Sequence, residues 1–293
     1  MGAAVSDQPC PVFLINLDRD PDRLAYMAAA LEKRGLGFTR IPAVLGLAMP
    51  EWVKPYFLDS AGAIASKLRV GEVGCYASHL VVAQRMVDGS IPAALVFEDD
   101  LEFPEDFTDL IAEALRRAPA GWDIIRLSNP PKAPYVPVAD LPGGRDLALY
   151  SRVPNNTGAS LLSLSGARKL LRPGPRDLQI DEHLRRPWDL GMETYGIVPA
   201  PIRSNIFDAS TIDAMDQRGL GREGLVKKLA RRRIATPGMA LKHFNWQIAR
   251  LGAIGWLRAT LRGLANSLSR KLGGTRKTGV EAQRHLRLDV NRN

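Results

Sequence analysis

The chain has 293 residues, of which 45% are hydrophobic and 24% charged, an ordinary globular composition with enough apolar residues for a core. The net charge of +9 is unevenly spread: residues 217–293 carry 18 Lys and Arg against 3 Asp and Glu, and the remainder carries 22 against 28. Two cysteines, Cys10 and Cys75, exclude a disulfide framework, and no run of 18 apolar residues predicts a membrane span.

The N-terminus has no basic region followed by a long apolar core, so no secretory signal is expected. The opening residues MGAAVS fit the loose myristoylation pattern, but that pattern is frequent by chance and carries no weight. A reducing, cytoplasmic location is therefore the expectation.

In chain order, the first half alternates apolar strands with amphipathic helices. Asp20 is the expected N-cap of the first helix, Pro21 suits its first turn, and Gly35 stops it. The predicted elements are a strand over 11–17, a helix over 18–35, a strand over 37–46, a helix over 70–89 and a strand over 92–100. Such an alternation predicts an α/β sheet.

The second half continues the alternation and then changes composition. Its predicted elements are a helix over 106–119, a short strand over 122–128, a strand turning into a helix over 158–171, and a helix, a loop and a late strand over 177–202. Residues 129–157 are rich in Pro, Gly and Asn, which predicts a long loop or a hairpin. After Asp216 the sequence is basic and helical.

Three adjacent acids, Glu98, Asp99 and Asp100, follow the apolar residues of the strand over 92–100. Side chains two apart on an extended chain point the same way, so Glu98 and Asp100 are expected to face one site and Asp99 the other side. Ligands of open α/β sheets gather at the carboxyl ends of strands. Hard oxygen ligands there suit Mn²⁺ or Mg²⁺, with diphosphate oxygens completing the shell. The alternative is a solvated acidic turn that caps the next helix.

A second group of charges follows the first strand. Asp18, Arg19 and Arg23 stand at a helix start, where the arginines could receive a nucleotide phosphate. The alternative is a surface helix with charge pairs between successive turns.

Residues 71–79, GEVGCYASH, form a third candidate segment. Its two glycines permit the backbone to approach a ligand closely, and Ser78 and His79 lie one turn beyond Cys75. Cys75 is interpreted as packing rather than as a nucleophile, because no base can be named for it. His79 suits a site or a satisfied position in the core.

Seven segments, taken in order, resemble the glycosyltransferases of family 25, which include bacterial lipooligosaccharide galactosyltransferases and their collagen-modifying relatives. The matching pieces, within residues 11–212, are VFLINLDRDPDRLAYM, IPAVLG, VGEVGCYASHLVVAQRMV, LVFEDDLEF, WDIIRLS, NTGASLLSLSGARKLL and IDEHL. GC-x-x-SH followed by EDD is a specific signal. The chain departs from the family at Leu45, where an Asp is usual, and at Ser160 or Leu161, where an aromatic is common.

The resemblance implies an α/β, GT-A-like fold with a mostly parallel central sheet, a UDP-hexose donor and inversion at the anomeric carbon. It implies galactose or glucose transfer to a saccharide or lipid-linked saccharide, in lipopolysaccharide or other surface-glycan assembly. Metal ligands are expected at Glu98 and Asp100, and the catalytic base at Asp181 or Glu182. Contacts to the nucleotide-sugar are expected at Asn16, Leu17, Arg19, Arg23, Ala43, Ser78, His79 and Asp99.

Two other functions stay open. A metal-dependent nucleotidyltransferase would also use a carboxylate-held metal, but the chain lacks a Gly-rich nucleotide loop. A catalytically impaired family member would bind glycan or membrane as a scaffold. The retained EDD argues against that alternative, and the missing Asp at Leu45 argues weakly for it.

The predicted organisation is an N-terminal lead over 1–10, a glycosyltransferase domain over 11–216 and a basic amphipathic helical extension over 217–293. The extension carries an apolar stripe at helical spacing, made of Ile254, Leu257, Leu261, Leu264 and Leu268. Such a helix suits an anionic membrane surface and would hold the enzyme peripherally on the inner face of the cytoplasmic membrane. Packing on the acidic catalytic domain is an equal alternative, and nucleic acid is a less expected partner.

Overall fold

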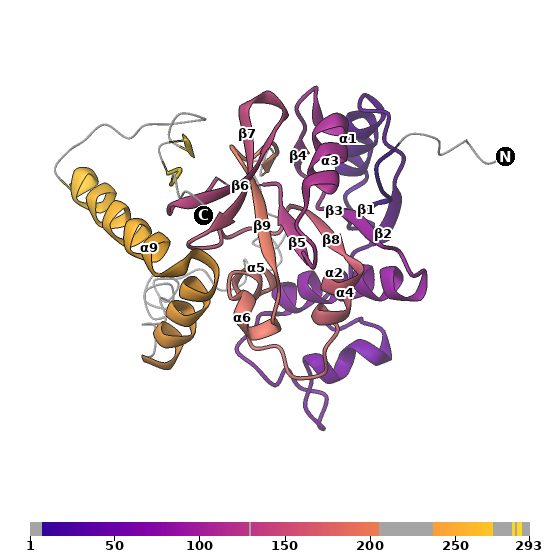
Figure 1. Ribbon diagram of the computed structural model, residues 1–293. Helices are drawn as coiled ribbons and strands as arrows, with labels where there is room; N and C mark the ends of the chain where they lie inside the picture. The colour runs from indigo at the N-terminus through magenta and orange to yellow at the C-terminus, as the bar shows by residue number, and fades with distance from the viewer. Residues whose placement is uncertain (1–7, 129, 205–236, 272–282, 285, 289–293) are drawn as a thin grey trace.

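The computed structural model describes residues 8–128, 130–204, 237–271, 283–284 and 286–288. They form an α/β structure in which helices cover both faces of one large sheet (Figure 1). This confirms the predicted fold class. The expected domain boundary at residue 216, together with residues 217–236 and 272–282 of the predicted extension, lies outside the described residues.

The central sheet has eight strands in the order β2-β1-β3-β8-β5-β9-β7-β6. The strands are β1 (Val12–Asn16), β2 (Thr39–Pro42), β3 (Ala93–Phe97), β5 (Ile124–Arg126), β6 (Tyr135–Leu141), β7 (Arg145–Tyr150), β8 (Ala159–Ser163) and β9 (Thr194–Val198). A separate two-stranded sheet pairs β4 (Leu101–Glu102) with β10 (Arg203–Ser204).

The sheet is mixed in direction. β1 runs parallel to β2 and β3, and β5 runs parallel to β9. β8 is inserted antiparallel between β3 and β5, so these two strands point the same way. The Pro- and Gly-rich segment forms the β6–β7 hairpin, which joins the sheet antiparallel to β9. The carboxyl ends of β1, β3 and β5 therefore share one edge, where the acidic segment emerges.

The helices form two layers. They are α1 (Pro21–Glu32), α2 (Val70–Asp88), α3 (Phe107–Arg117), α4 (Leu164–Leu170), α5 (Ile180–Leu184), α6 (Pro187–Leu190) and α9 (Pro237–Lys271), with 3₁₀ turns η1 (Glu51–Tyr56) and η2 (Pro142–Gly144). Figure 1 shows α1 and α3 on one side of the sheet and α2 and α4 on the other.

Alternation along the strands assigns side chains to the two layers. Leu14 and Phe97 share one core with Met27 of α1 and Leu110 of α3. Phe13 and Val96, their neighbours in sequence, share the other core with Leu80 of α2. Both faces of β1 and β3 are thus buried, as the continuous apolar runs predict.

Gly74 of α2 permits a close helix–loop contact. A Cβ at this position would lie 2.4 Å from the carbonyl oxygen of Val44 and 2.8 Å from the amide nitrogen of Gly46. The sequence predicts that this glycine permits a ligand to approach the backbone closely. In the structure it brings α2 against the backbone after β2.

The C-terminal helix α9 breaks at Gly252, whose φ of 67° lies in the left-handed region. Leu251 and Ala259 are buried in the core of the α1–α3 face, and Leu288 joins them. The helix also reaches the acidic domain directly: Lys242 lies 3.7 Å from Asp189, and Arg250 pairs with Glu193. Part of the extension therefore packs on the sheet domain.

The opposite side of the same helix is solvent-exposed. Ile254, Leu257, Leu261 and Leu264 of the predicted stripe are 67%, 50%, 58% and 57% exposed. No helix in the described part of the chain is long and apolar enough to cross a membrane.

Candidate functional site

The acidic segment after β3 separates its carboxylates between two clusters. Asp99 turns toward β1, where its Oδ2 accepts a hydrogen bond of 2.7 Å from Asn16 Nδ2. Its Oδ1 forms a 2.9 Å ion pair with Arg23 Nη1 of α1. Glu98 turns the other way, toward α2 and the loop before β8. Glu98 and Asp99 thus point to opposite sides, as expected for adjacent residues of an extended segment.

The first cluster combines several residues expected to contact the nucleotide. Asn16 also accepts a 3.0 Å hydrogen bond from Arg40 Nε, and Arg40 pairs with Asp18. The backbone carbonyl of Asn16 accepts from the amide of Ala43 at 3.0 Å. Leu17 follows at the strand end and is half-buried.

Arg19 lies beside this first cluster but is exposed. Arg23, by contrast, is engaged with Asp99. The structure thus gives the two arginines different tasks: Arg23 positions the acidic segment, and Arg19 is directed to solvent.

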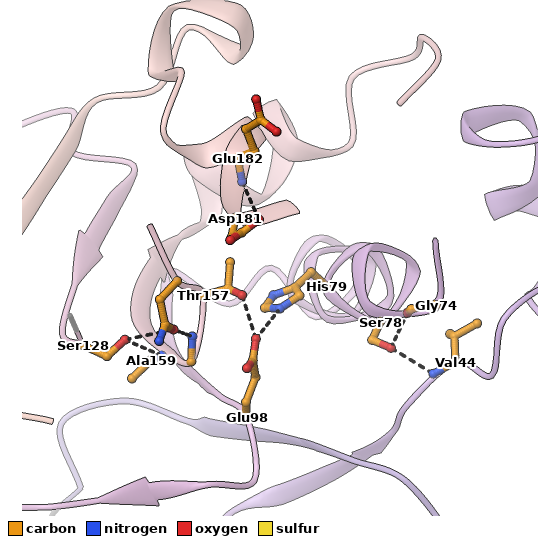
Figure 2. A network of polar contacts seen from close by, with 12 residues as sticks. Val44, Gly74, Ser78, His79, Glu98, Ser128, Thr157, Ala159, Asp181 and Glu182 are labelled. Carbon is orange, nitrogen blue, oxygen red and sulfur yellow. Dashed lines mark hydrogen bonds and ion pairs between the residues drawn. The ribbon is translucent and has the colours of Figure 1, made fainter. Parts of the chain in front are cut away.

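The second cluster surrounds Glu98. Thr157 Oγ1 donates a 2.7 Å hydrogen bond to Glu98 Oε1, and His79 Nε2 lies 3.6 Å from the same oxygen (Figure 2). Burial opposes ionisation of Glu98, but His79, Thr157 and the charge of Arg126 together outweigh it, so the pKa of Glu98 lies below its usual range. Glu98 is therefore a carboxylate at neutral pH.

Ser78, one residue before His79, has its hydrogen bonds inside the fold. Its Oγ donates to the carbonyl of Gly74 at 2.8 Å and accepts from the amide of Val44 at 2.9 Å (Figure 2). It links α2 to the segment after β2, close to Ala43.

Asp181 and Glu182, the two candidates for the base, point in different directions. Figure 2 shows Asp181 on the side facing Thr157 and Glu98, and the Glu182 carboxylate turned away. Glu182 pairs with Arg186 at 2.6 Å. Asp181 accepts hydrogen bonds from Asn155 Nδ2 and from the amide of Glu182. The geometry favours Asp181.

The environment of Asp181 suits proton transfer. Burial raises the pKa of its carboxyl above the usual value, and the charge of Glu98 adds to that effect. The hydrogen bond from Glu182, the charge of Arg126 and the hydrogen bond from Asn155 act in the opposite direction. A carboxylate with a raised pKa is a stronger base than an ordinary aspartate.

Arg126 is a site residue that the sequence interpretation missed. It ends β5, is 1% exposed, and none of its three guanidinium nitrogens has a hydrogen-bond partner in the described structure. Burial lowers its pKa, and the charges of Tyr150, Asp181 and Glu98 act against that lowering. A buried cation without hydrogen bonds is costly, so it marks a place where an anion or a developing negative charge would be stabilised.

The acidic segment also contains the carboxylates that could bind a divalent metal ion. Carboxylates of Glu98 and Asp100 are oxygen ligands suited to Mn²⁺ or Mg²⁺, which one or two carboxylates bind together with substrate phosphates. Glu98 is engaged with His79 and Thr157, and half-buried Asp100 follows two residues later. The chemistry of these carboxylates therefore fits such an ion, and Asp100 is the residue that would hold it. His183 does not contribute, because Tyr76 holds its Nδ1 at 2.7 Å in the core.

Comparison with known proteins shows which family these clusters resemble. Residues 10–135 match the model of "Glycosyltransferase family 25 (LPS biosynthesis protein)". Over these residues the chain is similar to glycosyltransferase family 25. The residues of the clusters around Asp99 and Glu98 lie within the matched residues, except for Thr157 and Asp181. The mixed sheet with helices on both faces agrees with the α/β fold class that the resemblance implied.

Two relatives show the range of the family. The human protein named inactive glycosyltransferase 25 family member 3 is 34% identical over 195 residues, which cover 59% of this chain and 31% of that protein. The Xenopus laevis procollagen galactosyltransferase 1-A is 31% identical over 196 residues, which cover 61% of this chain and 31% of that protein. The chain thus spans about a third of the length of these relatives.

Among solved structures, mouse xyloside xylosyltransferase 1 aligns over 63% of this chain and 77% of its own, with 15% identity and a TM-score of 0.31. That similarity is too weak to support an inference about the candidate site.

Proposed function

We propose that this chain is an inverting glycosyltransferase that moves a hexose, galactose or glucose, from a UDP-sugar to a saccharide acceptor in lipopolysaccharide or other surface-glycan assembly. One observation carries the proposal: the half-buried Asp181, with its raised pKa, lies on the side facing Glu98 (Figure 2), and the charge of Arg126 acts on both carboxylates. The match of residues 10–135 to the family 25 model and the named galactosyltransferase among the relatives support it.

In the proposed reaction, Asp181 takes the proton of an acceptor hydroxyl. The freed oxygen attacks the anomeric carbon from the face opposite UDP, and the bond between that carbon and the diphosphate oxygen breaks. The anomeric configuration inverts, and UDP leaves. Arg126 contributes positive charge beside the carboxylates, which keeps Asp181 ionised more readily than burial alone would allow.

The donor diphosphate is assigned to the edge formed by β1, α1 and the acidic segment. Asp99 is held there by Asn16 and Arg23, which fixes the backbone of the neighbouring Asp100. A divalent Mn²⁺ or Mg²⁺ ion, when bound by Asp100, would neutralise charge on the departing UDP. Exposed Arg19 is available to the nucleotide phosphates.

The second candidate is a catalytically inactive family member that binds a glycan. The identity to human family member 3, which is named inactive, favours this reading specifically. Leu45, which stands where the family usually has an Asp, is 45% exposed and contributes no charge to the site. The two candidates predict the same donor binding and differ in turnover.

We also propose that α9 attaches the enzyme to an anionic membrane surface. Its face with Leu251 and Ala259 is already buried against the sheet domain, so the exposed stripe of Ile254, Leu257, Leu261 and Leu264 is free for another contact. Residues 217–293 carry a charge of +15, which complements anionic lipid. A lipid-linked acceptor would be reached at that surface.

The test of the proposed function is UDP release from a panel of UDP-hexoses at saturating Mn²⁺. The wild-type chain should release UDP from at least one donor. Asp100→Asn should keep the melting temperature and lose release, because an amide is a poorer ligand for a hard cation. UDP binding without release by the wild type would instead select the inactive reading, and near-full turnover by Asp100→Asn would remove the assignment of Asp100.

A further inference from the structure

Cys75 and His79 stand one helical turn apart on α2, so their side chains lie on the same face of the helix. Glu98, at the end of β3, meets them there. One ligand atom from each residue, a sulfur, a ring nitrogen and a carboxylate oxygen, all lie within 4.8 Å of one another. Of the His, Cys, Asp and Glu residues that the structure describes, these are the three that come together in this way.

An unsatisfied nitrogen points into this group. His79 is 7% exposed, and its buried Nε2 has no hydrogen-bond partner within the described structure. Glu98 Oε1 lies 3.6 Å from it, which is too long for a hydrogen bond. Figure 2 shows the imidazole ring facing the Glu98 carboxylate across this gap. Buried polar atoms are almost always paired, so a missing ligand is indicated.

The surroundings of the group favour a cation. The negative charges of Glu98, Asp181 and Glu72 act on Cys75 and would attract a cation to it. Arg126 is the opposing charge on the Glu98 side. Thr157 already orients the Glu98 carboxylate by its hydrogen bond, in the manner of the partners that fix metal-binding carboxylates.

We propose that Cys75, His79 and Glu98 bind a divalent transition-metal ion of the zinc type. Sulfur and imidazole nitrogen are ligands that zinc accepts readily, whereas Mg²⁺ and Mn²⁺ prefer oxygen. Three protein ligands leave one position of a tetrahedral ion for water or a substrate oxygen. The thiol would lose its proton to solvent on binding, since the thiolate is the metal ligand.

This site takes Glu98 from the acidic segment but not Asp100, which is left to the proposed donor-diphosphate metal. It does not depend on catalysis, since an inactive protein would retain it. It also changes the interpretation of Cys75, which the sequence suggests is packing alone.

Cobalt titration of the full chain tests the proposal, because a thiolate bound to Co²⁺ gives a charge-transfer band in the near ultraviolet. The wild type, purified free of metal, should bind one Co²⁺ with such a band, and Zn²⁺ should displace it. Cys75→Ala should lose the band, and His79→Gln should weaken Co²⁺ affinity by about tenfold or more. Cys10→Ala is the matched control, since Cys10 is the other cysteine of the chain and is buried in the opposite core.

Asp100→Asn separates this site from the proposed function: it should lose UDP release and keep the cobalt band. Circular dichroism of each variant without metal shows that it is folded. The proposal is overturned if the wild type shows no thiolate band, or if the band survives Cys75→Ala. It is equally overturned if the band disappears in Cys10→Ala while Cys75→Ala keeps it.

Discussion

At the scale of single residues, the proposed chemistry depends on the difference between two adjacent carboxylates. Asp181 is held by Asn155 and by the amide of Glu182, whereas Glu182 is held by Arg186 on the other side of α5. The sequence gives both acids as candidates for the catalytic base and does not distinguish between them. The choice depends on the loop before β8, which supplies Asn155.

Asp181→Asn should reduce transfer by about 10²–10⁴-fold, the usual contribution of a general base. Glu182→Gln should change it little. The base acts ionised and its pKa is raised, so wild-type activity should fall with decreasing pH earlier than for an ordinary aspartate. Profiles of kcat/KM against pH measure this limb. If kcat/KM of Asp181→Asn still falls with decreasing pH as in the wild type, or if this fall is lost in Glu182→Gln, Asp181 is not the base.

Arg126 is the clearest case of a residue that sequence reasoning overlooks. An arginine in the short strand WDIIRLS gives no signal of burial, because the β6–β7 hairpin and β9 that extend the sheet beyond β5 come later in the chain. Only the structure shows that the Arg126 guanidinium is buried without hydrogen bonds, where the charges of Asp181 and Glu98 act on it.

Arg126→Met should preserve or raise the melting temperature, since it removes a buried charge without hydrogen bonds. It should also shift the acidic limb of activity to higher pH, because Arg126 lowers the pKa of Asp181. Thermal denaturation and the kcat/KM profile together are decisive. A large fall in melting temperature with an unmoved limb would make Arg126 a structural residue only.

At the scale of elements, the sequence predicts most of the fold because its apolar runs and helix-ending glycines mark where strands and helices begin and end. Apolar runs predict β1 and β3 closely, and Gly89 ends α2 as expected. The mixed direction of the sheet is harder, because the antiparallel insertion of β8 depends on long-range pairing rather than on any local pattern. For the same reason, the sequence shows that Cys75 and His79 share a helix face but not that Glu98 meets them.

The contact between α2 and the segment after β2 gives a test at this scale. Gly74→Ala should destabilise the protein by about 1–3 kcal/mol, since the added Cβ would overlap the backbone of Val44 and Gly46. Gly238→Ala in α9 is the control: its Cβ would meet nothing within 4 Å, so the change should be neutral or stabilising. Denaturant unfolding measures both, and equal effects would show that the α2 contact is loose.

At the scale of the whole molecule, the extension has two faces with different partners. Leu251, Ala259 and Leu288 bind it to the sheet domain, and the amide of Leu288 donates to the carbonyl of Tyr135 at 2.8 Å. Removing everything after residue 216 would therefore uncover apolar core as well as remove charge. Single substitutions on each face are the sharper probe.

Leu257→Ser with Leu261→Ser should leave stability nearly unchanged, since both side chains are at least half exposed, and should abolish co-sedimentation with anionic vesicles. Leu251→Ser, on the buried face, should instead lower stability. Wild-type binding should weaken as salt rises, because screening acts over about 8 Å at physiological ionic strength. Vesicle binding that survives the double substitution would refute the proposed membrane face.

The stereochemistry of donor cleavage tests the central proposal most directly. Proton NMR of the sugar first released from an α-linked UDP-hexose at saturating Mn²⁺ reports its anomeric configuration before mutarotation. If Asp181 activates an incoming oxygen opposite the departing UDP, the initial product is the β-anomer, and Asp181→Asn does not form it. An initial α-anomer, or release that is unchanged in Asp181→Asn, would contradict the account.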